Sequence, residues 1–212
     1  MIGDSDEEFA NSFSFHPVKT ITTCEGGAIT TNNKDTYEVL RSLRSHSIEN
    51  RGVEKPWSYE INKIGYNYRL PDVQCALGIS QLKRIESFIE AREAIANRYS
   101  EILKPLNGVL TPIKWSQNCR PSYHLYPVLI DFSKCKVTKS ELFVHAKSQG
   151  IGLQVHYIPL SVQQYYKRFD HVNDCSGALA FYEKVVSLPI FPELGLENIE
   201  KITDTLCVAL LQ

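Results

Sequence analysis

The sequence of 212 residues lacks the features that mark three broad functional classes. Its 23 basic side chains are balanced by 24 acidic ones, for a net charge of −1, whereas nucleic-acid binding needs a basic surface. No apolar run approaches the roughly 20 residues of a membrane span. The first residues are acidic and lack the basic and apolar regions of a secretory signal peptide. A hydrophobic content of 43% and a charged content of 22% are typical of a globular protein, and we expect a cytoplasmic one.

Paired cysteines are also absent. The six cysteines are widely spread and form no C-x-x-C pair, so their spacing argues against a zinc site and against a disulfide framework. We therefore expect reduced thiols and no metal centre. There are no internal repeats or low-complexity tracts, which leaves hydrophobic periodicity as the guide to the fold.

That periodicity predicts two regions joined by a long helix. The expected strands cover 9–15, 27–31, 123–132 and 151–157, and the expected helices cover 33–46, 71–104, 138–150, 174–187 and 197–211. The polar segment 47–62 is predicted to be a loop. Asn33 or Asn32 is a candidate N-cap, and the sequence from Thr138 to Glu141 is a capping box. The second half is thus predicted to be a compact α+β domain.

One lysine stands out from the other polar residues. Lys19 lies in a short turn after the first expected strand and before the pair Gly26-Gly27. An amine held rigidly at a strand end and partly desolvated can become nucleophilic enough to form a Schiff base. On residue type alone, an ordinary surface lysine is the commoner case.

Five further residues are candidates for binding. Ser14 precedes Lys19 by five positions, and its hydroxyl could bind a phosphate or close a local turn. Asn67 could equally be a turn residue. Arg69 could hold a diphosphate or carboxylate bidentately, or form a surface ion pair. His156 and Tyr157 could contact a substrate, although a satisfied histidine at a strand end is the simpler interpretation.

The run from Phe13 to Ala28, F-S-F-H-P-V-K-T-I-T-T-C-E-G-G-A, resembles the lysine motif of the DegT/StrS-type sugar aminotransferases, which use pyridoxal 5′-phosphate (PLP). The resemblance continues in the family's order along the chain. It includes Gly65 to Leu70, Asp72 to Leu82, Ser122 to Pro127, Gly150 to Leu160 and Ser187 to Pro192.

The fold that this resemblance implies is α/β, the PLP-dependent transferase fold of the aspartate aminotransferase type. Residues 1–70 would be the end of the large PLP-binding domain, 71–104 a bridging helix and 105–212 the complete small α+β domain. Members of the family are longer, and their first half supplies the aspartate that pairs with the pyridine nitrogen. We therefore expect this chain to be the C-terminal half of such an enzyme.

The resemblance also implies roles for the candidate residues. Lys19 would carry PLP as a Schiff base and shuttle protons, while Ser14 would contact the phosphate. Asn67 would reach the phosphate of the neighbouring subunit's cofactor, which implies a homodimer with a shared active site. His156 and Tyr157 would contact the sugar.

The implied reaction transfers an amino group, with glutamate as the expected donor, to the 4-keto carbon of a UDP- or dTDP-linked 6-deoxy sugar for surface glycans. The motif is most similar to enzymes that act on UDP-linked 4-keto-N-acetylhexosamines on the route to pseudaminic acid. Lys19 argues against the related dehydratase branch, which has histidine there. Two alternatives stay open, a catalytically inactive fragment and one half of a split enzyme with a separately encoded N-terminal half. Whether this chain alone is an enzyme therefore stays open too.

Overall fold

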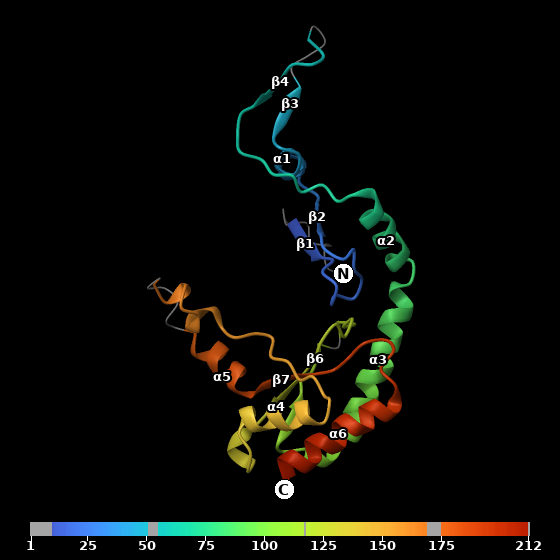
Figure 1. Ribbon diagram of the computed structural model, residues 1–212, viewed down its shortest axis with the longest axis vertical. Helices are drawn as coiled ribbons and strands as arrows, with labels where there is room; N and C mark the ends of the chain where they lie inside the picture. The colour runs from blue at the N-terminus through green and yellow to red at the C-terminus, as the bar shows by residue number, and fades with distance from the viewer. Residues whose placement is uncertain (1–9, 51–54, 117, 169–174, 212) are drawn as a thin grey trace. The chain divides into compact units, whose positions relative to one another are not determined.

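The computed structural model describes residues 10–50, 55–116, 118–168 and 175–211. The chain divides into two compact units, Met1–Ile85 and Glu86–Gln212, and each is considered on its own (Figure 1). In the described ranges, no helix is both long enough and apolar enough to cross a bilayer.

The first unit begins with an antiparallel hairpin. Strand β1 (Ala10–Ser14) pairs with β2 (Gly27–Thr31), in a register that places Phe13 opposite Ala28. Both strands were predicted. A Cβ atom on Gly27 would lie 2.5 Å from the carbonyl oxygen of Phe13, so the close approach of the two strands requires glycine here. The connection between the strands, residues 15–26, contains Lys19 and is called the lysine turn below.

Helix α1 (Lys34–Arg44) follows, and Asn33 caps it as predicted, since its Oδ1 accepts a hydrogen bond from Thr36 N at 2.7 Å. The predicted loop over 47–62 is wrong where it is described, because β3 (Ile48–Asn50) and β4 (Tyr59–Ile61) form an antiparallel ribbon. Ile48 pairs with Ile61 across it. Residues 51–54 of that segment lie outside the described residues.

The single helix expected over 71–104 is also wrong, because it is divided into α2 (Asp72–Leu82) and α3 (Ile85–Ile102). Between them the amide of Arg84 donates to the Gln81 carbonyl, three residues back rather than four. This tighter turn interrupts the α-helical pattern without a glycine or proline to signal it. The boundary between the units falls directly after it.

The first unit has almost no core of its own. Among its described residues only Thr23 and Ser47 are buried, and α1 and α2 contain no buried residue. Apolar side chains on the hairpin are exposed instead, with Phe13 at 43% and Ile29 at 52%. A two-stranded hairpin is marginally stable by itself, and the hairpin of this unit leaves these apolar side chains uncovered by the described residues.

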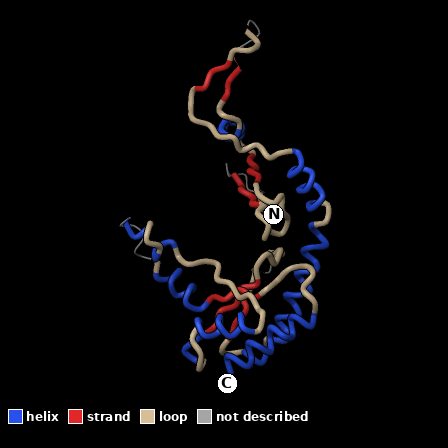
Figure 2. The backbone as a smooth tube through the Cα atoms, in the orientation of Figure 1, coloured by secondary structure: helices blue, strands red, loops and turns tan. Residues whose placement is uncertain are grey.

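The second unit combines helices with an antiparallel sheet of order β5-β6-β7 (Figure 2). Its strands are β5 (Leu110–Pro112), β6 (Tyr126–Ile130) and β7 (Val185–Leu188). Besides α3, its helices are α4 (Lys139–Ser148), α5 (Ser176–Lys184) and α6 (Leu196–Leu211), with short 3-10 helices at Lys104–Leu106, Phe132–Lys134, Leu160–Val162 and Tyr166–Arg168.

Two predictions in the second unit need correction. The helix expected over 174–187 ends at Lys184, and its last residues belong to β7, because the β-branched Val185 and Val186 are fully buried in the sheet. The strand expected over 151–157 is absent from these described residues, where only Gln154 forms an isolated bridge, with Ser187.

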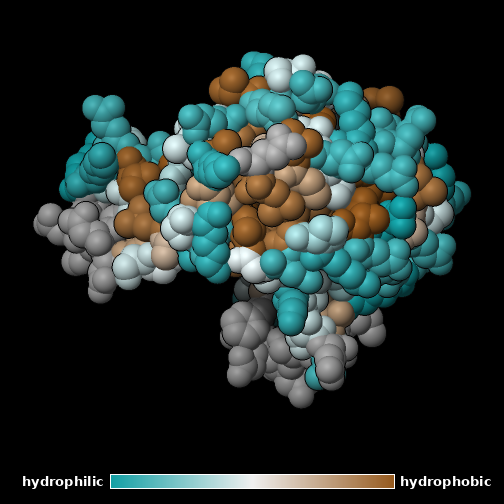
Figure 3. All heavy atoms as spheres, turned by 90° about the horizontal axis from the view of Figure 1, so that it is seen from below, coloured by the Kyte–Doolittle hydropathy of each residue, from teal (hydrophilic) through white to brown (hydrophobic). Residues whose placement is uncertain are grey.

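This unit has a well-formed hydrophobic core. Alternate residues of β6 point into it, α4 packs against α6, and α5 contacts β6. The predicted capping box starts α4, with Thr138 and Glu141 bonded reciprocally. Core members include Tyr99, Leu106, Leu110, Val128, Ile130, Leu142, Ile199 and Leu206. On the face seen in Figure 3, hydrophobic residues still lie in patches among hydrophilic ones.

Candidate active site

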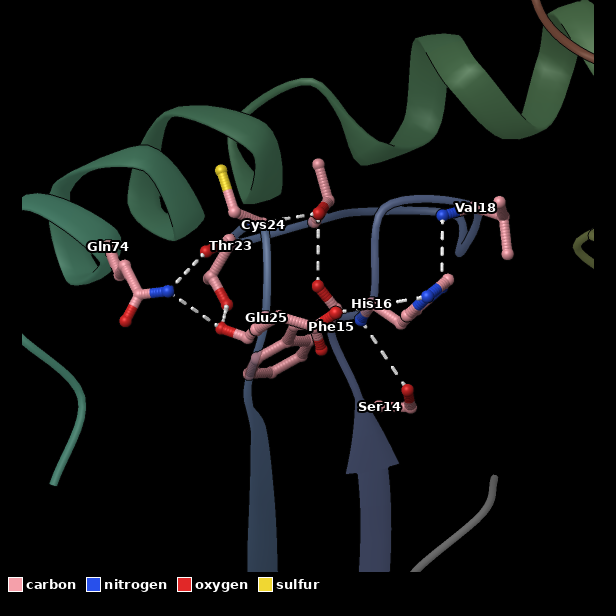
Figure 4. Close-up of polar contacts among 9 residues, drawn as sticks. Ser14, Phe15, His16, Val18, Thr23, Cys24, Glu25 and Gln74 are labelled. Carbon is pink, nitrogen blue, oxygen red and sulfur yellow. Dashed lines mark hydrogen bonds and ion pairs between the residues drawn. The ribbon is translucent and has the colours of Figure 1, made fainter. Parts of the chain in front are cut away.

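The lysine turn is closed at its base by backbone hydrogen bonds. The amide of Phe15 donates to the Gly26 carbonyl at 2.9 Å, and the amide of Thr23 donates to the Phe15 carbonyl at 3.0 Å. The Thr22 hydroxyl donates to the same carbonyl of Phe15 at 3.0 Å (Figure 4). The two legs of the turn are therefore tied together just beyond the hairpin.

Lys19 lies at the far side of this turn. Its backbone amide donates to the His16 carbonyl at 2.9 Å, and its side chain is partly buried. Within the part of the chain that the structure describes, the amine makes no hydrogen bond or ion pair. His16 contributes to the local geometry, since its Nδ1 accepts a long bond from Val18 N at 3.5 Å. The amine is thus held on an ordered turn and remains available to a ligand.

Ser14 ends β1 at the same end of the hairpin. Its hydroxyl is exposed and, among the described residues, accepts only a long bond, 3.5 Å, from the amide of His16. The hydroxyl proton is therefore free to be donated to an anion. Ser14 thus ends the strand that leads into the lysine turn, and Lys19 lies within that turn.

Sequence reasoning assigned no role to two residues of α2 that contact this turn. The Gln74 side-chain amide donates to the carbonyls of Thr23 and Glu25, both at 3.0 Å. A Cβ atom on Gly78 would lie 2.8 Å from Thr23 Cγ2, so the absence of a side chain lets the helix approach. Their i, i+4 spacing places both on one helix face, and this spacing was the signal available in the sequence.

Asn67 and Arg69 lie elsewhere in the first unit. Asn67 is exposed and forms an isolated bridge with Ser45, which follows α1. The rings of Tyr66 and Tyr68 stack with their centroids 4.7 Å apart, and strand alternation places the Asn67 side chain on the opposite side. Arg69 is exposed. Among the described residues, no hydrogen bond or ion pair joins Asn67 or Arg69 to the lysine turn.

His156 and Tyr157 belong to the second unit. The Nδ1 atom of His156 and the Ser187 hydroxyl are 2.9 Å apart, which anchors the histidine to β7. The Tyr157 side chain is 69% exposed, and its ring meets that of His156 edge to face. These contacts match the satisfied histidine considered above, while the exposed phenol is free to meet a ligand.

A separate hollow of about 520 Å³ lies between α1 and the ribbon. Its lining is mixed in charge, with Arg41 Nη1 3.9 Å from a carboxylate oxygen of Glu38 and the Glu49 carboxylate accepting from Asn62. In the described part of the chain, no cluster of three or more metal-ligating side chains occurs. All six cysteines are unpaired thiols.

With this geometry in view, comparison with known proteins is decisive. Residues 1–207 match the DegT/DnrJ/EryC1/StrS aminotransferase family. The chain belongs to this family. It is 40% identical over 194 residues to the UDP-4-amino-4,6-dideoxy-N-acetyl-beta-L-altrosamine transaminase of Campylobacter jejuni, covering 92% of this chain and 50% of that protein.

Solved structures agree with this assignment. Helicobacter pylori PseC, an aminotransferase involved in the biosynthesis of pseudoaminic acid, superposes with a TM-score of 0.85 at 34% identity, over 95% of this chain and 53% of that one. Spr1654 of Streptococcus pneumoniae, solved in a PLP-form, gives a TM-score of 0.82 at 28% identity, over 94% of this chain and 51% of that one. The present chain therefore spans about half the length of the relatives it matches.

The residues of the lysine turn fit part of a PLP site. Lys19 provides an amine without a competing carboxylate among the described residues, and Ser14 provides a hydroxyl for a phosphate. The described first unit offers no aspartate that would pair with the pyridine nitrogen of PLP. Its aspartates, Asp35 and Asp72, lie in the first turns of α1 and α2, where they serve the helix ends.

Proposed function

We propose that this chain is the half of a PLP-dependent sugar aminotransferase that carries the cofactor lysine, Lys19. The enzyme transfers an amino group, that of glutamate, to the 4-keto carbon of a UDP- or dTDP-linked 6-deoxy sugar. The observation that carries the proposal is the closed lysine turn, which holds Lys19 directly after the strand that ends at Ser14, in a chain of this family.

When bound, PLP supplies an aldehyde that bonds to amines and a ring that withdraws electrons from the substrate carbon. Lys19 would be the residue that holds the cofactor. Its Nζ nitrogen would serve as the base that takes a proton from one carbon and returns it to another. Its partial burial keeps bulk water from competing for that proton.

The other candidates bind and orient. Ser14 donates its hydroxyl proton to the cofactor phosphate. Asn67, exposed on the first unit, reaches the phosphate in the second subunit of a homodimer. Arg69 takes the diphosphate or a carboxylate, and Tyr157, supported by His156, contacts the sugar.

The narrower substrate is a UDP-linked 4-keto-6-deoxy-N-acetylhexosamine, made for pseudaminic acid. Its support is the altrosamine transaminase of Campylobacter jejuni at 40% identity and PseC of Helicobacter pylori at 34%. The six unpaired cysteines fit a reducing cytoplasm.

Further polypeptide completes the site. The apolar side chains exposed on the hairpin need cover, and the pyridine nitrogen needs an acidic partner that Asp35 and Asp72 do not offer from the helix ends. The segment equivalent to the other half of the relatives supplies both, either on the same polypeptide or on a separate one.

A chimera tests this function. The part of the Campylobacter jejuni transaminase that this chain does not cover would be joined to this chain, and amination of the UDP-linked keto sugar by glutamate would be followed by mass spectrometry. We expect turnover that Lys19→Ala abolishes and that Lys34→Ala, which changes an exposed lysine at the start of α1, leaves intact. Turnover that survives Lys19→Ala would contradict the assignment.

The second candidate function is that this chain alone is a catalytically inactive fragment. The near absence of buried residues in the first unit favours it. Its test is turnover by the purified chain with PLP, glutamate and the keto sugar. Turnover by the chain alone would eliminate this candidate, and turnover that appears only with a complementing half would identify a split site.

A further inference from the structure

The hydrogen bonds from α2 to the lysine turn suggest a role beyond packing. The Nε2 atom of the Gln74 side chain donates to two backbone carbonyl oxygens, those of Thr23 and Glu25, and lies 3.0 Å from each (Figure 4). A single donor group shared by two carbonyls fixes their relative direction more narrowly than either bond alone. These two carbonyls belong to residues 23–26, the part of the turn that leads into β2 and is called its returning leg below.

The turn is shaped to make this double contact possible. Cys24, between the two carbonyl residues, has a φ of +68°, and the left-handed conformation turns the chain so that both carbonyls face one donor. The Thr23 hydroxyl donates to the Glu25 carbonyl at 2.8 Å. The Glu25 carbonyl oxygen thus uses its second lone pair. Thr23 is 98% buried against α2, at the point where Gly78 leaves room.

The returning leg in turn sets the place of Lys19. Thr23 is bonded to the Phe15 carbonyl, and Phe15 is bonded to Gly26, so both legs move together. Lys19 has one backbone bond, to His16, and no side-chain bond among the described residues. The position of Lys19 is therefore determined by the base of the turn, which Gln74 of α2 holds through two hydrogen bonds.

We propose that Gln74 is a positioning residue for Lys19, and that α2 fixes the cofactor amine through the carbonyls of Thr23 and Glu25. The inference rests on the proposed function for its catalytic meaning, but its geometric content concerns this chain alone. The side-chain amide of Gln74 donates to backbone carbonyls and not to Lys19, so the role assigned to it is positioning.

The test replaces Gln74 by methionine, which keeps the length of the side chain and removes both donors. Gln81→Met is the matched control, since Gln81 lies on the same helix and its side chain makes no hydrogen bond with the described residues. Lysines of the full chain would be dimethylated with 13C-formaldehyde and borohydride, and the methyl signals recorded by NMR. Lys19→Arg identifies the Lys19 signal.

We expect the Lys19 signal of the unsubstituted chain to lie apart from those of exposed lysines. In Gln74→Met it should move into their range, while Gln81→Met leaves it in place and the signals of Lys34 and Lys63 do not move. A Lys19 signal unmoved by Gln74→Met would overturn the proposal, as would one already among the exposed lysines. Equal movement of Lys34 and Lys63 would also overturn it, because it indicates general loosening of the unit.

A second readout uses the cofactor. The PLP concentration that half-labels Lys19 on borohydride reduction should rise about tenfold in Gln74→Met, the order expected when a reacting group is displaced, and stay unchanged in Gln81→Met. An unchanged concentration in Gln74→Met would contradict the proposal. If the chimera described above captures no PLP at Lys19, the proposed function fails, while the NMR comparison still decides the role of Gln74.

Discussion

Because Gly78 contacts Thr23, Gly78→Ala should lower the opening free energy of the lysine turn in the present chain. The same substitution should raise that free energy when Thr23 is replaced by serine. Alanine normally stabilises a helix by about 1 kcal/mol relative to glycine. In α2 the added Cβ would lie 2.8 Å from Thr23 Cγ2, whereas carbon atoms in contact are usually about 3.5–4.0 Å apart. Thr23 is buried, so the methyl group cannot simply swing away.

The size of the effect follows from these two terms. Overpacking of this kind costs about 1–3 kcal/mol, so Gly78→Ala should lower the opening free energy of the lysine turn by about 0–2 kcal/mol after the helical gain of about 1 kcal/mol. Thr23→Ser removes the clashing methyl group and keeps the hydroxyl that bonds Glu25. In that background Gly78→Ala should instead stabilise by about 1 kcal/mol.

Hydrogen exchange measured by mass spectrometry reports this directly, on a peptide that contains the bonded amides of Phe15 and Thr23. The two backgrounds should differ by about 1–3 kcal/mol, the coupling expected of residues in contact. Equal effects of Gly78→Ala in both backgrounds would refute the packing argument.

Three further predictions concern single residues. Cys24→Gly should raise the opening free energy of the turn by about 0.5–1 kcal/mol, because relief of the left-handed φ outweighs the added chain entropy; Cys24→Ala is the control, and no gain would show that the strain is absent. Burial raises the pKa of Tyr99, so the folded state binds the phenol proton more tightly and stability is lost as pH rises above about 10. Urea unfolding should show that the free energy of unfolding falls less steeply with pH in Tyr99→Phe than in the unsubstituted chain. An equally steep fall in both would contradict this. Thr138→Ala should destabilise the second unit by about 1 kcal/mol, while Ser140→Ala, outside the capping box, should not; equal urea midpoints would refute the role of the cap.

The sequence predicted those elements whose causes are local. The hairpin follows from strand alternation and the Gly26-Gly27 pair, and the caps at Asn33 and Thr138 need only residues within the first helical turn. The same local information placed Ser14 on the first strand and Lys19 in the turn that follows it. These predictions are confirmed because the relevant partners are close in the chain.

Where the partners are distant, the predictions were wrong or incomplete. Val185 and Val186 follow the helical pattern of α5 but pair with β6, because burial in the sheet overrides the local pattern. The tight turn at Arg84 has no glycine or proline signal. The role of Gln74 depends on carbonyls far back in the sequence, which only the folded chain brings near.

The identity of Lys19 as the cofactor lysine is tested most directly by chemical capture. The chimera of this chain with the remaining part of the Campylobacter jejuni transaminase would be incubated with PLP, reduced with borohydride and digested, and the modified peptides identified by mass spectrometry. We expect the pyridoxyl group on Lys19, with the label lost in Lys19→Ala and retained in Lys34→Ala. Label spread over exposed lysines such as Lys34 and Lys63, or no selective label at Lys19, would contradict the account.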